Sequence, residues 1–145
     1  MMELKIKKLN PDAVLPAYQT AGAAGMDLCA CVPAPLKIPT RGYVVVPTGI
    51  AIAVPEGYAA FVFARSGLAI KSGITLRNSV GVIDCDYRGE ILVGLQNQSD
   101  LPYEIKPGER IAQMVLMPAP QAKIVECDSL DDTARGAGVF GSTGK

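Results

Sequence analysis

The sequence predicts an all-β fold, a barrel or jelly roll that carries a single short helix. Three observations support this prediction. Short apolar runs rich in β-favouring residues follow one another along most of the chain. The 15 glycines and 11 prolines include clear turn signals between these runs. With 145 residues and an apolar fraction of 49%, the chain is large enough for one domain with its own hydrophobic core.

The order of the elements follows from the alternation of apolar residues and from the breaks that interrupt it. Strands are predicted over residues 2–9, 26–32, 43–46, 50–54, 58–64, 90–97, 101–105, 111–117 and 122–127. The stretch 65–71 is the best candidate for the helix, which we expect to have one turn at most. Ser66 has a hydroxyl that can cap its N-terminus. The closely spaced strands and single helix favour a barrel or jelly roll.

Residues 1–127 are predicted to form the β domain, and residues 128–145 a flexible arm. The arm contains several acidic residues, and glycines at positions 136, 138, 141 and 144. Such a composition cannot bury enough apolar surface to form a core. We therefore expect the arm to be mobile.

The stretch 78–90 is the central feature of the chain. It is predicted to be a strand followed by a tight reversal into the next strand, with Gly89 available for a positive φ. The turn also contains Asp84, Asp86 and Tyr87, which a turn with no other role would not require. We interpret this hairpin as a nucleoside pocket with a catalytic carboxylate at its edge.

Composition excludes several classes of function. The net charge is zero, which argues against a protein that coats duplex nucleic acid, because such binding needs a basic surface. Histidine is absent, so the usual general base and the usual zinc ligand are missing. Acid–base chemistry must therefore depend on Asp, Glu, Tyr, Lys or Cys.

The cysteines and the N-terminus indicate a reducing compartment. Cys29 and Cys31 do not have the spacing of a zinc site or a redox pair, and we expect reduced thiols with a mainly structural role. No signal peptide and no apolar run long enough to span a membrane are visible. The sequence thus predicts a cytoplasmic protein without a membrane partner.

Polar residues in three other stretches of the body are candidates for ligand contacts. The sequence 65–67, Arg-Ser-Gly, at a helix start can hold phosphate, or it can be an ordinary helix cap with an exposed arginine. Asp27 follows a glycine-rich loop, where it can contact a metal-bound water or cap a turn. Gln113 lies in an apolar strand, where its amide needs partners and can be a satisfied core amide.

The arm adds a fourth set of candidates. Arg135, Ser142 and Thr143 can contact a phosphate chain, and Phe140 can stack on a base. The alternative is a frayed C-terminus, in which a single Phe among glycines is unusual.

Five stretches together resemble the five ordered motifs of the trimeric dUTPase (deoxyuridine triphosphate nucleotidohydrolase) family. They are residues 21–28, 65–69, 81–90, 108–113 and 135–144. One such motif is a weak signal, but five in order over nearly the whole chain are specific. Val139 stands where the family usually has glycine, and a β-branched residue resists a positive φ.

The resemblance implies a jelly-roll-like, distorted β-barrel that forms a C3 homotrimer. It also implies three active sites, each shared between subunits. One subunit would supply Asp27, Arg65 and Gln113, a second the stretch 78–90, and a third the arm.

The implied reaction is hydrolysis of dUTP to dUMP and pyrophosphate, which limits uracil incorporation into DNA and supplies dUMP for thymidylate synthesis. Asp84 would activate the water that attacks the α-phosphorus. Mg²⁺ would bind the phosphates, with Asp27 and Gln113 contacting its waters without being direct ligands. Phosphate oxygens would be bound by Arg65, Ser66 and Gly67.

Recognition of the nucleoside would depend mainly on the stretch 78–90. The residues that the resemblance places around uracil are Asn78, Gly81, Val82, Ile83, Asp84 and Leu92. Tyr87 would pack beneath the deoxyribose and exclude a 2′-hydroxyl. In the closed arm, Phe140 would cover the uracil, Arg135 and Thr143 would reach the γ-phosphate, and Gly141 and Ser142 would complete the contact.

Two other functions remain open at the level of sequence. A dCTP deaminase-like or bifunctional enzyme of the same fold would release ammonia from dCTP. A catalytically inactive β module would use a retained nucleotide pocket to bind a protein partner.

Overall fold

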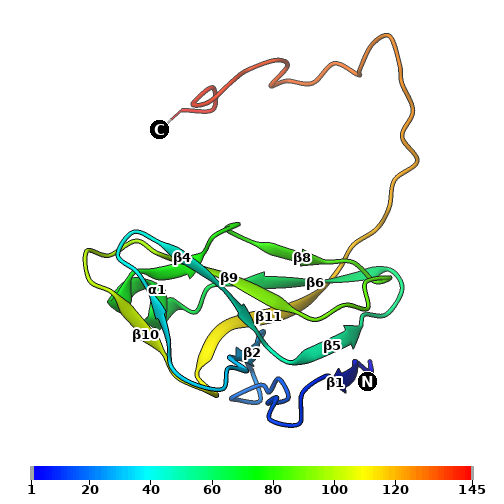
Figure 1. Cartoon of the computed structure of the whole chain (residues 1–145). Helices are drawn as coiled ribbons and strands as arrows, with labels where there is room; N and C mark the ends of the chain where they lie inside the picture. The colour runs from blue at the N-terminus through cyan, green and yellow to red at the C-terminus, as the bar shows by residue number, and fades with distance from the viewer. Residues whose placement is uncertain (1, 145) are drawn as a thin grey trace.

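Short strands joined by tight turns build the body of the protein (Figure 1). A computed structural model describes residues 2–144 of the chain. Its elements are β1 (Lys5–Lys8), β2 (Met26–Cys29), β3 (Leu36–Ile38), β4 (Tyr43–Pro47), β5 (Ile50–Ala53), β6 (Tyr58–Phe63), α1 (Ser66–Ser72), β7 (Ile74–Leu76), β8 (Gly81–Ile83), β9 (Leu92–Asn97), β10 (Tyr103–Ile105) and β11 (Arg110–Pro118).

Two antiparallel sheets carry most of the structure. One has the strand order β2-β11-β6-β8 and the other the order β4-β9-β7, and the pairs β1-β5 and β10-β3 complete the body. Neighbouring strands are often distant in sequence: β11 lies between β2 and β6 and pairs with both. The prediction of an all-β, jelly-roll-like fold with one short helix is confirmed.

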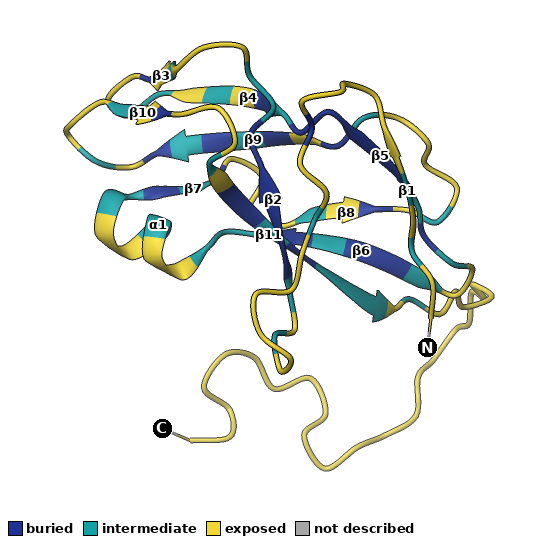
Figure 2. Ribbon diagram, turned by 90° about the horizontal axis from the view of Figure 1, so that it is seen from below, coloured by how far each residue is buried: buried dark blue, intermediate teal, exposed yellow. Residues whose placement is uncertain are grey.

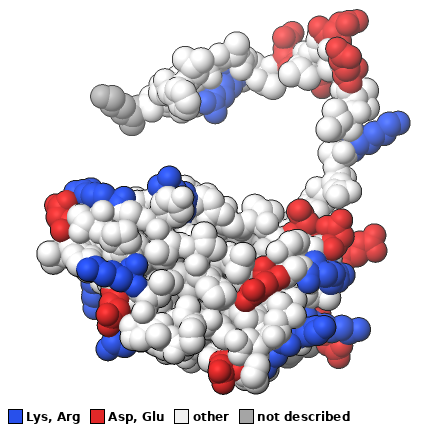
Figure 3. Space-filling view, viewed as in Figure 1, with Lys and Arg blue, Asp and Glu red and all other residues white. Residues whose placement is uncertain are grey.

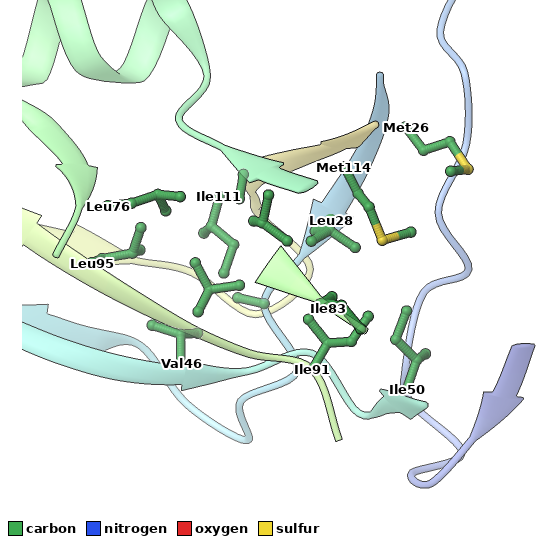
Figure 4. Packing of buried hydrophobic residues seen from close by; sticks show 14 of the residues in the cluster. Met26, Leu28, Val46, Ile50, Leu76, Ile83, Ile91, Leu95, Ile111 and Met114 are labelled. Carbon is green, nitrogen blue, oxygen red and sulfur yellow. The ribbon is translucent and has the colours of Figure 1, made fainter. Parts of the chain in front are cut away.

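The hydrophobic core lies between the two main sheets (Figure 4). Leu28 and Met114 enter it from the four-stranded sheet, and Val46 and Leu95 from the three-stranded sheet, each at most 1% exposed. Close packing of such aliphatic side chains supplies the main stabilisation of a fold without tryptophan. The core thereby fixes the relative position of the two sheets and of the corner that joins β8 to β9.

The helix differs from the prediction at its start. Arg65 occupies the N-cap position with extended backbone, and no side chain caps the helix, so the predicted Ser66 cap is wrong. Ser66 is instead the first residue of a seven-residue helix, longer than the one turn expected. The extended conformation of β6 continues through Arg65. The Arg65 side chain pairs with Asp27 and does not contribute to the helix. The helix ends at Gly73, which has the left-handed φ of 69° typical of a C-terminal cap.

Two short strands were not predicted, and one predicted strand is absent. β3 and β7 have three residues each, too few for a clear alternation. The strand predicted over residues 122–127 is wrong, because this segment is exposed coil with no neighbouring strand, and Ile124 is 95% exposed. An isolated apolar run gains nothing from extended structure when no partner satisfies its main chain.

The arm leaves the body after β11 and turns back across it without packing against it (Figures 1 and 2). Every described residue from Pro120 to Gly144 is exposed. On the face seen in Figure 3, cationic and anionic side chains are interspersed over the body, and acidic side chains gather on the arm. Across residues 2–144, no helix is both long and apolar enough to cross a membrane.

Candidate active site

A pocket of about 240 Å³ lies where the two main sheets meet, between β8 and β9. It brings together all the nucleoside contacts predicted in the body: Asn78, Gly81, Val82, Ile83, Asp84, Tyr87 and Leu92. Additional lining residues, not predicted from the sequence, include Glu90 and Ile91. The stretch 78–90 therefore does form one side of a cavity.

The predicted hairpin is wrong, although the pocket exists. β8 pairs with β6, and β9 lies between β4 and β7, so the two strands belong to different sheets. Residues 84–91 are a corner between these sheets, with Ile83 and Ile91 buried at its two ends. Each strand gains a partner distant in sequence and a face in the core, which strand alternation alone cannot reveal. Because β8 is an edge strand, one side of its main chain faces away from β6.

Gly89 is required for packing and not for a positive φ. Gly89 was available for a positive φ, but the corner does not use that conformation, since Gly89 is absent from the residues that adopt it. A Cβ at this position would lie 2.6 Å from Cζ of Tyr87, so only glycine accommodates the ring. The Tyr87 hydroxyl donates a hydrogen bond of 2.9 Å to the main-chain oxygen of Glu90.

Asp84 is exposed at the boundary of two cavities. It lines the pocket described above and a second cavity of about 550 Å³, which it shares with Cys85 and Asp86. Within residues 2–144, no side chain or main-chain group donates a hydrogen bond to its carboxylate in the structure. Both carboxylate oxygens thus face solvent and are available to a water or a ligand.

A second polar cluster surrounds Asp27 at the junction of β2 and β11. Asp27 is only 9% exposed, and its two oxygens accept from two arginines. Oδ1 is 2.9 Å from Nε of Arg65, and Oδ2 is 3.1 Å from Nη1 of Arg110. Arg65 also donates from Nη1 to the main-chain oxygen of Arg110 at 3.2 Å. The arrangement neutralises a buried carboxylate and fixes the direction of the Arg65 side chain.

Arg110 is the residue of this cluster that the sequence analysis missed. The pairing of β11 with β2 shifts register between Arg110 and Ala112, which indicates a β-bulge. Bulges redirect side chains near functional sites, and this one coincides with the contact from Arg110 to Asp27. An arginine at the start of an otherwise apolar strand was the available signal.

Gln113 lies opposite Asp27 in the β11–β2 register. Its Nε2 donates to the main-chain oxygen of Ala64 at 2.9 Å. A Cβ at Gly25 would lie 2.8 Å from its Oε1, so the glycine leaves room for this amide. The amide is therefore held in one orientation at the same junction as Asp27.

We expect Asp27→Asn to lower the free energy of unfolding by about 2 kcal/mol, because two arginines lose their shared counter-charge in a largely buried position. Urea denaturation measures the change. Asp100→Asn is the matched control, since its 2.7 Å pair with Arg41 is exposed and should contribute less than about 1 kcal/mol. Equal effects of the two substitutions would contradict the structural role of Asp27.

The turn before Arg110 is fixed by Tyr103 and Glu109. The Tyr103 hydroxyl donates to one carboxylate oxygen of Glu109, and the other oxygen accepts from the Lys106 amide at 2.8 Å. Burial, with the hydrogen bond to Glu109 next in size, raises the pKa of Tyr103 to about 12. This network holds the strand that carries Arg110 and Gln113.

The raised pKa of Tyr103 gives a pH prediction. Because its pKa is about 12 in the folded protein and about 10 in an unfolded chain, the stabilisation is complete below pH 10 and is lost as the pH rises toward 12. Tyr103→Phe should cost about 1 kcal/mol at pH 8 and progressively less above pH 10. Urea denaturation at pH 8 and pH 11 measures both values, with exposed Tyr18→Phe as control. A cost independent of pH would contradict this assignment.

The remaining predicted site residues lie apart from the pocket. Arg65 and Gly67 line a separate surface groove of about 490 Å³ that also includes Arg110 and that Asp84 does not reach, and Ser66 is exposed. The described arm residues predicted to bind substrate (Arg135, Phe140, Gly141, Ser142 and Thr143) are all exposed and line none of these cavities. One chain alone therefore does not assemble the full set.

Val139 and the four cysteines are compatible with this conformation. Val139 does not adopt a positive φ, whereas Gly136, Gly141 and Gly144 do.

All four cysteines are free. Burial, with a smaller contribution from Asp27, raises the pKa of Cys29.

No metal cage is preformed in the part of the chain that the structure describes. Across residues 2–144, no three His, Cys, Asp or Glu side chains are grouped so as to hold an ion. Both oxygens of Asp27 are already engaged by arginines. A cation held mainly by ligand phosphates and waters fits these residues, while direct coordination by several protein carboxylates does not.

The two-sheet antiparallel body, its corner pocket and the exposed glycine-rich arm define a jelly-roll-like β protein. A family model described as dUTPase matches residues 12–144. The deoxyuridine 5′-triphosphate nucleotidohydrolase of Wolinella succinogenes is 54% identical over 144 residues, which cover 99% of this chain and 95% of the relative. That of Nautilia profundicola is 53% identical and covers 99% and 100% of the two chains. The chain belongs to the dUTPase family.

Solved structures give the same fold. A mutant dUTPase of Staphylococcus bacteriophage 80alpha with dUpNHpp superposes with a TM-score of 0.90 at 24% identity and full coverage of both chains. A mutant dUTPase from phage phi11 of S. aureus, described with a structural Mg(II) ion, has a TM-score of 0.80 at 21% identity, covering 88% of this chain and 98% of that one. The family resemblance and the fold expected from the sequence are thus confirmed.

Proposed function

We propose that the protein hydrolyses dUTP to dUMP and pyrophosphate, which limits uracil incorporation into DNA and supplies dUMP for thymidylate synthesis. The observation that carries the proposal is the corner pocket with Asp84 at its edge, in a chain that belongs to the dUTPase family. The pocket volume of about 240 Å³ suits a small, deeply inserted group such as a nucleobase.

The uracil contacts come from the edge strand β8 and its surroundings. Main-chain groups of Val82, Ile83 and Asp84 and the amide of Asn78 provide fixed donors and acceptors for the edge of the base. A cytosine would leave such groups unpaired, which reduces reaction by roughly 10⁴-fold in favourable cases. The main chain around Gly81 and Leu92 closes the pocket against the 5-methyl group of thymine.

The deoxyribose packs against Tyr87. The ring is held by its hydrogen bond to Glu90 and by close contact with Gly89. A rigid aromatic ring at this position leaves no space for a 2′-hydroxyl, so UTP is a poor substrate.

We expect Gly89→Ala to lower the preference for dUTP over UTP, measured as the ratio of their kcat/KM values, by about tenfold. The new Cβ would displace the Tyr87 ring, and because this side chain is exposed, the loss of stability should stay below about 1 kcal/mol. Gly22→Ala is the matched control, since no atom lies within 4 Å of a Cβ at that position. An unchanged ratio in Gly89→Ala would show that the ring position does not control selectivity.

Asp84 activates the attacking water. Its carboxylate is exposed and carries no internal hydrogen bond among the described residues, so it can orient a water and accept its proton during attack on the α-phosphorus. Pyrophosphate leaves as the bond to the bridging oxygen breaks. Positioning and charge stabilisation supply most of the barrier lowering in phosphoryl transfer, which suits a chain without histidine.

The phosphate chain is bound by the groove at the start of α1. Arg65, held in place by Asp27, binds phosphate oxygens together with Ser66 and the main chain of Gly67. Asp27 and Gln113 would contact the waters of a Mg²⁺ ion bound with the phosphates, without being direct ligands. Such an ion would supply positive charge that favours departure of pyrophosphate.

A complete site requires several copies of the chain. The Asp84 pocket and the Arg65 groove have no lining residue in common, and the described arm residues, 128–144, line neither of them. We infer a homotrimer in which the Asp84 pocket of one subunit faces the Arg65 groove of a second. The arm of a third subunit closes over the nucleotide: Phe140 covers uracil, Arg135 and Thr143 bind the γ-phosphate, and Gly141 and Ser142 complete the closure.

Pyrophosphate release from dUTP, dTTP, dCTP and UTP, each with and without Mg²⁺, tests the proposal. Rapid release from dUTP alone, dependent on Mg²⁺, is the expected result. Ammonia release from dCTP would instead indicate deaminase activity. Light scattering after size-exclusion chromatography tests the trimer.

A further inference from the structure

The corner that carries Tyr87 is anchored to the turn between β4 and β5. Oε1 of Glu90 accepts a hydrogen bond of 2.8 Å from the main-chain amide of Gly49. Next to it, the Thr48 hydroxyl donates to the Ile91 oxygen at 2.7 Å, and the Ile91 amide donates to the Ile50 oxygen at 2.9 Å. The end of the corner is therefore attached through both main-chain and side-chain contacts.

The other end of this contact is fixed in the core. Gly49 is buried, with a left-handed φ of 69°. A Cβ there would lie 2.8 Å from Sγ of Cys31 and 2.9 Å from Cβ of Ala13. Its carbonyl oxygen accepts from the amide of Leu9 at 2.8 Å. The hydrogen bond from the Gly49 amide therefore attaches Glu90 to a part of the molecule with little freedom to move.

Because Glu90 is anchored to Gly49, it also restrains the position of the Tyr87 ring. Its side chain fixes its own main chain, and the main-chain oxygen accepts the hydrogen bond from the Tyr87 hydroxyl. Gly89, between them, is packed against the ring. The carboxylate is engaged with Gly49, which makes Glu90 unsuited to a second acid–base role although it lines the pocket.

We propose that Glu90 is a positioning residue that determines the discrimination between dUTP and UTP by holding the Tyr87 ring in place. This inference rests on the proposed function, in which Tyr87 excludes the 2′-hydroxyl. Without the Glu90 side chain, the corner and the ring gain freedom, and a ribonucleotide can be accommodated. Among the described residues, no hydrogen bond joins the Glu90 side chain to Asp84, so turnover of dUTP should be affected less than selectivity.

The test compares Glu90→Ala with Glu90→Gln. The measured quantity is the ratio of kcat/KM for dUTP to kcat/KM for UTP. Glu90→Ala should lower this ratio by about tenfold, the effect of losing one charge-assisted hydrogen bond. Glu90→Gln keeps an oxygen that can accept from Gly49 and should retain the ratio within about threefold. A lowered ratio with Glu90→Ala and rescue with Glu90→Gln support the inference, because a general loss of structure would reduce both reactions together.

Tyr87→Phe tests the same interaction from the other side, because it removes the hydroxyl that donates to the main-chain oxygen of Glu90. It removes only the hydroxyl of an exposed side chain, so folding should be preserved even if Glu90→Ala fails to fold. We expect it to lower the ratio by about tenfold, and the double variant Glu90→Ala/Tyr87→Phe to show no further loss, since both changes break one connection.

Three outcomes would overturn the inference: an unchanged ratio in Glu90→Ala, an unchanged ratio in Tyr87→Phe, or fully additive losses in the double variant. Absence of pyrophosphate release from dUTP by the wild-type protein would be a different result, because it would overturn the proposed function itself. Activity of the wild-type protein on dUTP with unchanged ratios in the variants would overturn only the role of Glu90.

Discussion

Replacement of Asp84 by asparagine is expected to reduce kcat for dUTP by about 10³-fold or more while leaving substrate affinity nearly unchanged. Asparagine has the size of aspartate and can still lie beside a water, but it cannot accept the proton of that water. The main-chain groups that would contact uracil are the same in both proteins. Pyrophosphate release gives kcat, and calorimetric titration with dUTP, which the variant consumes only slowly, gives the dissociation constant.

Asp86→Asn is the control for this experiment. Asp86 is a neighbouring exposed carboxylate, and it lines the second cavity but not the uracil pocket. Its replacement should change kcat by less than about threefold, because an exposed carboxylate that only contacts solvent contributes little. Normal turnover by Asp84→Asn would exclude Asp84 as the base, and equal losses in both variants would indicate a general effect of charge.

Local patterns predicted most of the strands but none of their pairings. The run 111–117 was found almost to its ends, because a long stretch of mainly apolar residues after a Pro-Gly turn is a clear strand signal. The segment 122–127 has a similar apolar character and is nevertheless coil. The difference is that β11 lies between two strands and Ile124 has none beside it, a fact of tertiary structure that no local window contains.

The corner at residues 84–91 shows why a site can be predicted when its geometry cannot. Asp84 and Tyr87 were identified because a simple turn does not require them, and both line the pocket. The hairpin assumed for them was wrong, since β8 and β9 pair with strands far away in the sequence. The anchoring of Glu90 on Gly49 spans 41 positions, and only the folded chain brings these groups together.

The cluster around Asp27 gives the opposite case. Asp27, Arg65 and Gln113 were predicted as separate candidates, each with an ordinary structural alternative. In the fold they meet at one strand junction, together with Arg110, and the two arginines share a single carboxylate. Arg65 was expected to bind phosphate. Its ion pair with Asp27 fixes the orientation of its side chain, which would then approach a phosphate from one direction only.

Removal of the arm, in a variant that ends at Ala134, is expected to lower kcat/KM for dUTP by about 10²-fold or more and to leave the fold and the proposed trimer intact. From Pro120 to Gly144 every described residue is exposed and none contributes to the core, so the body loses no packing. Catalysis would lose the phosphate contacts proposed for Arg135 and the exclusion of water proposed for Phe140. Pyrophosphate release, circular dichroism and light scattering measure the three properties.

Phe140→Ala separates the two contributions of the arm. The side chain is 105% exposed, so its removal cannot destabilise the isolated subunit, and any effect must arise in a closed complex with nucleotide. We expect Phe140→Ala to lower kcat/KM by about tenfold, the value of one base-stacking contact. Its kcat/KM would then lie between those of the wild-type and the truncated protein. Leu130→Ala, with an equally open side chain in the arm at 86% exposure, should have no effect. If truncation instead dissociated the oligomer, the arm would hold subunits together, and the loss of activity could not be assigned to closure over the substrate.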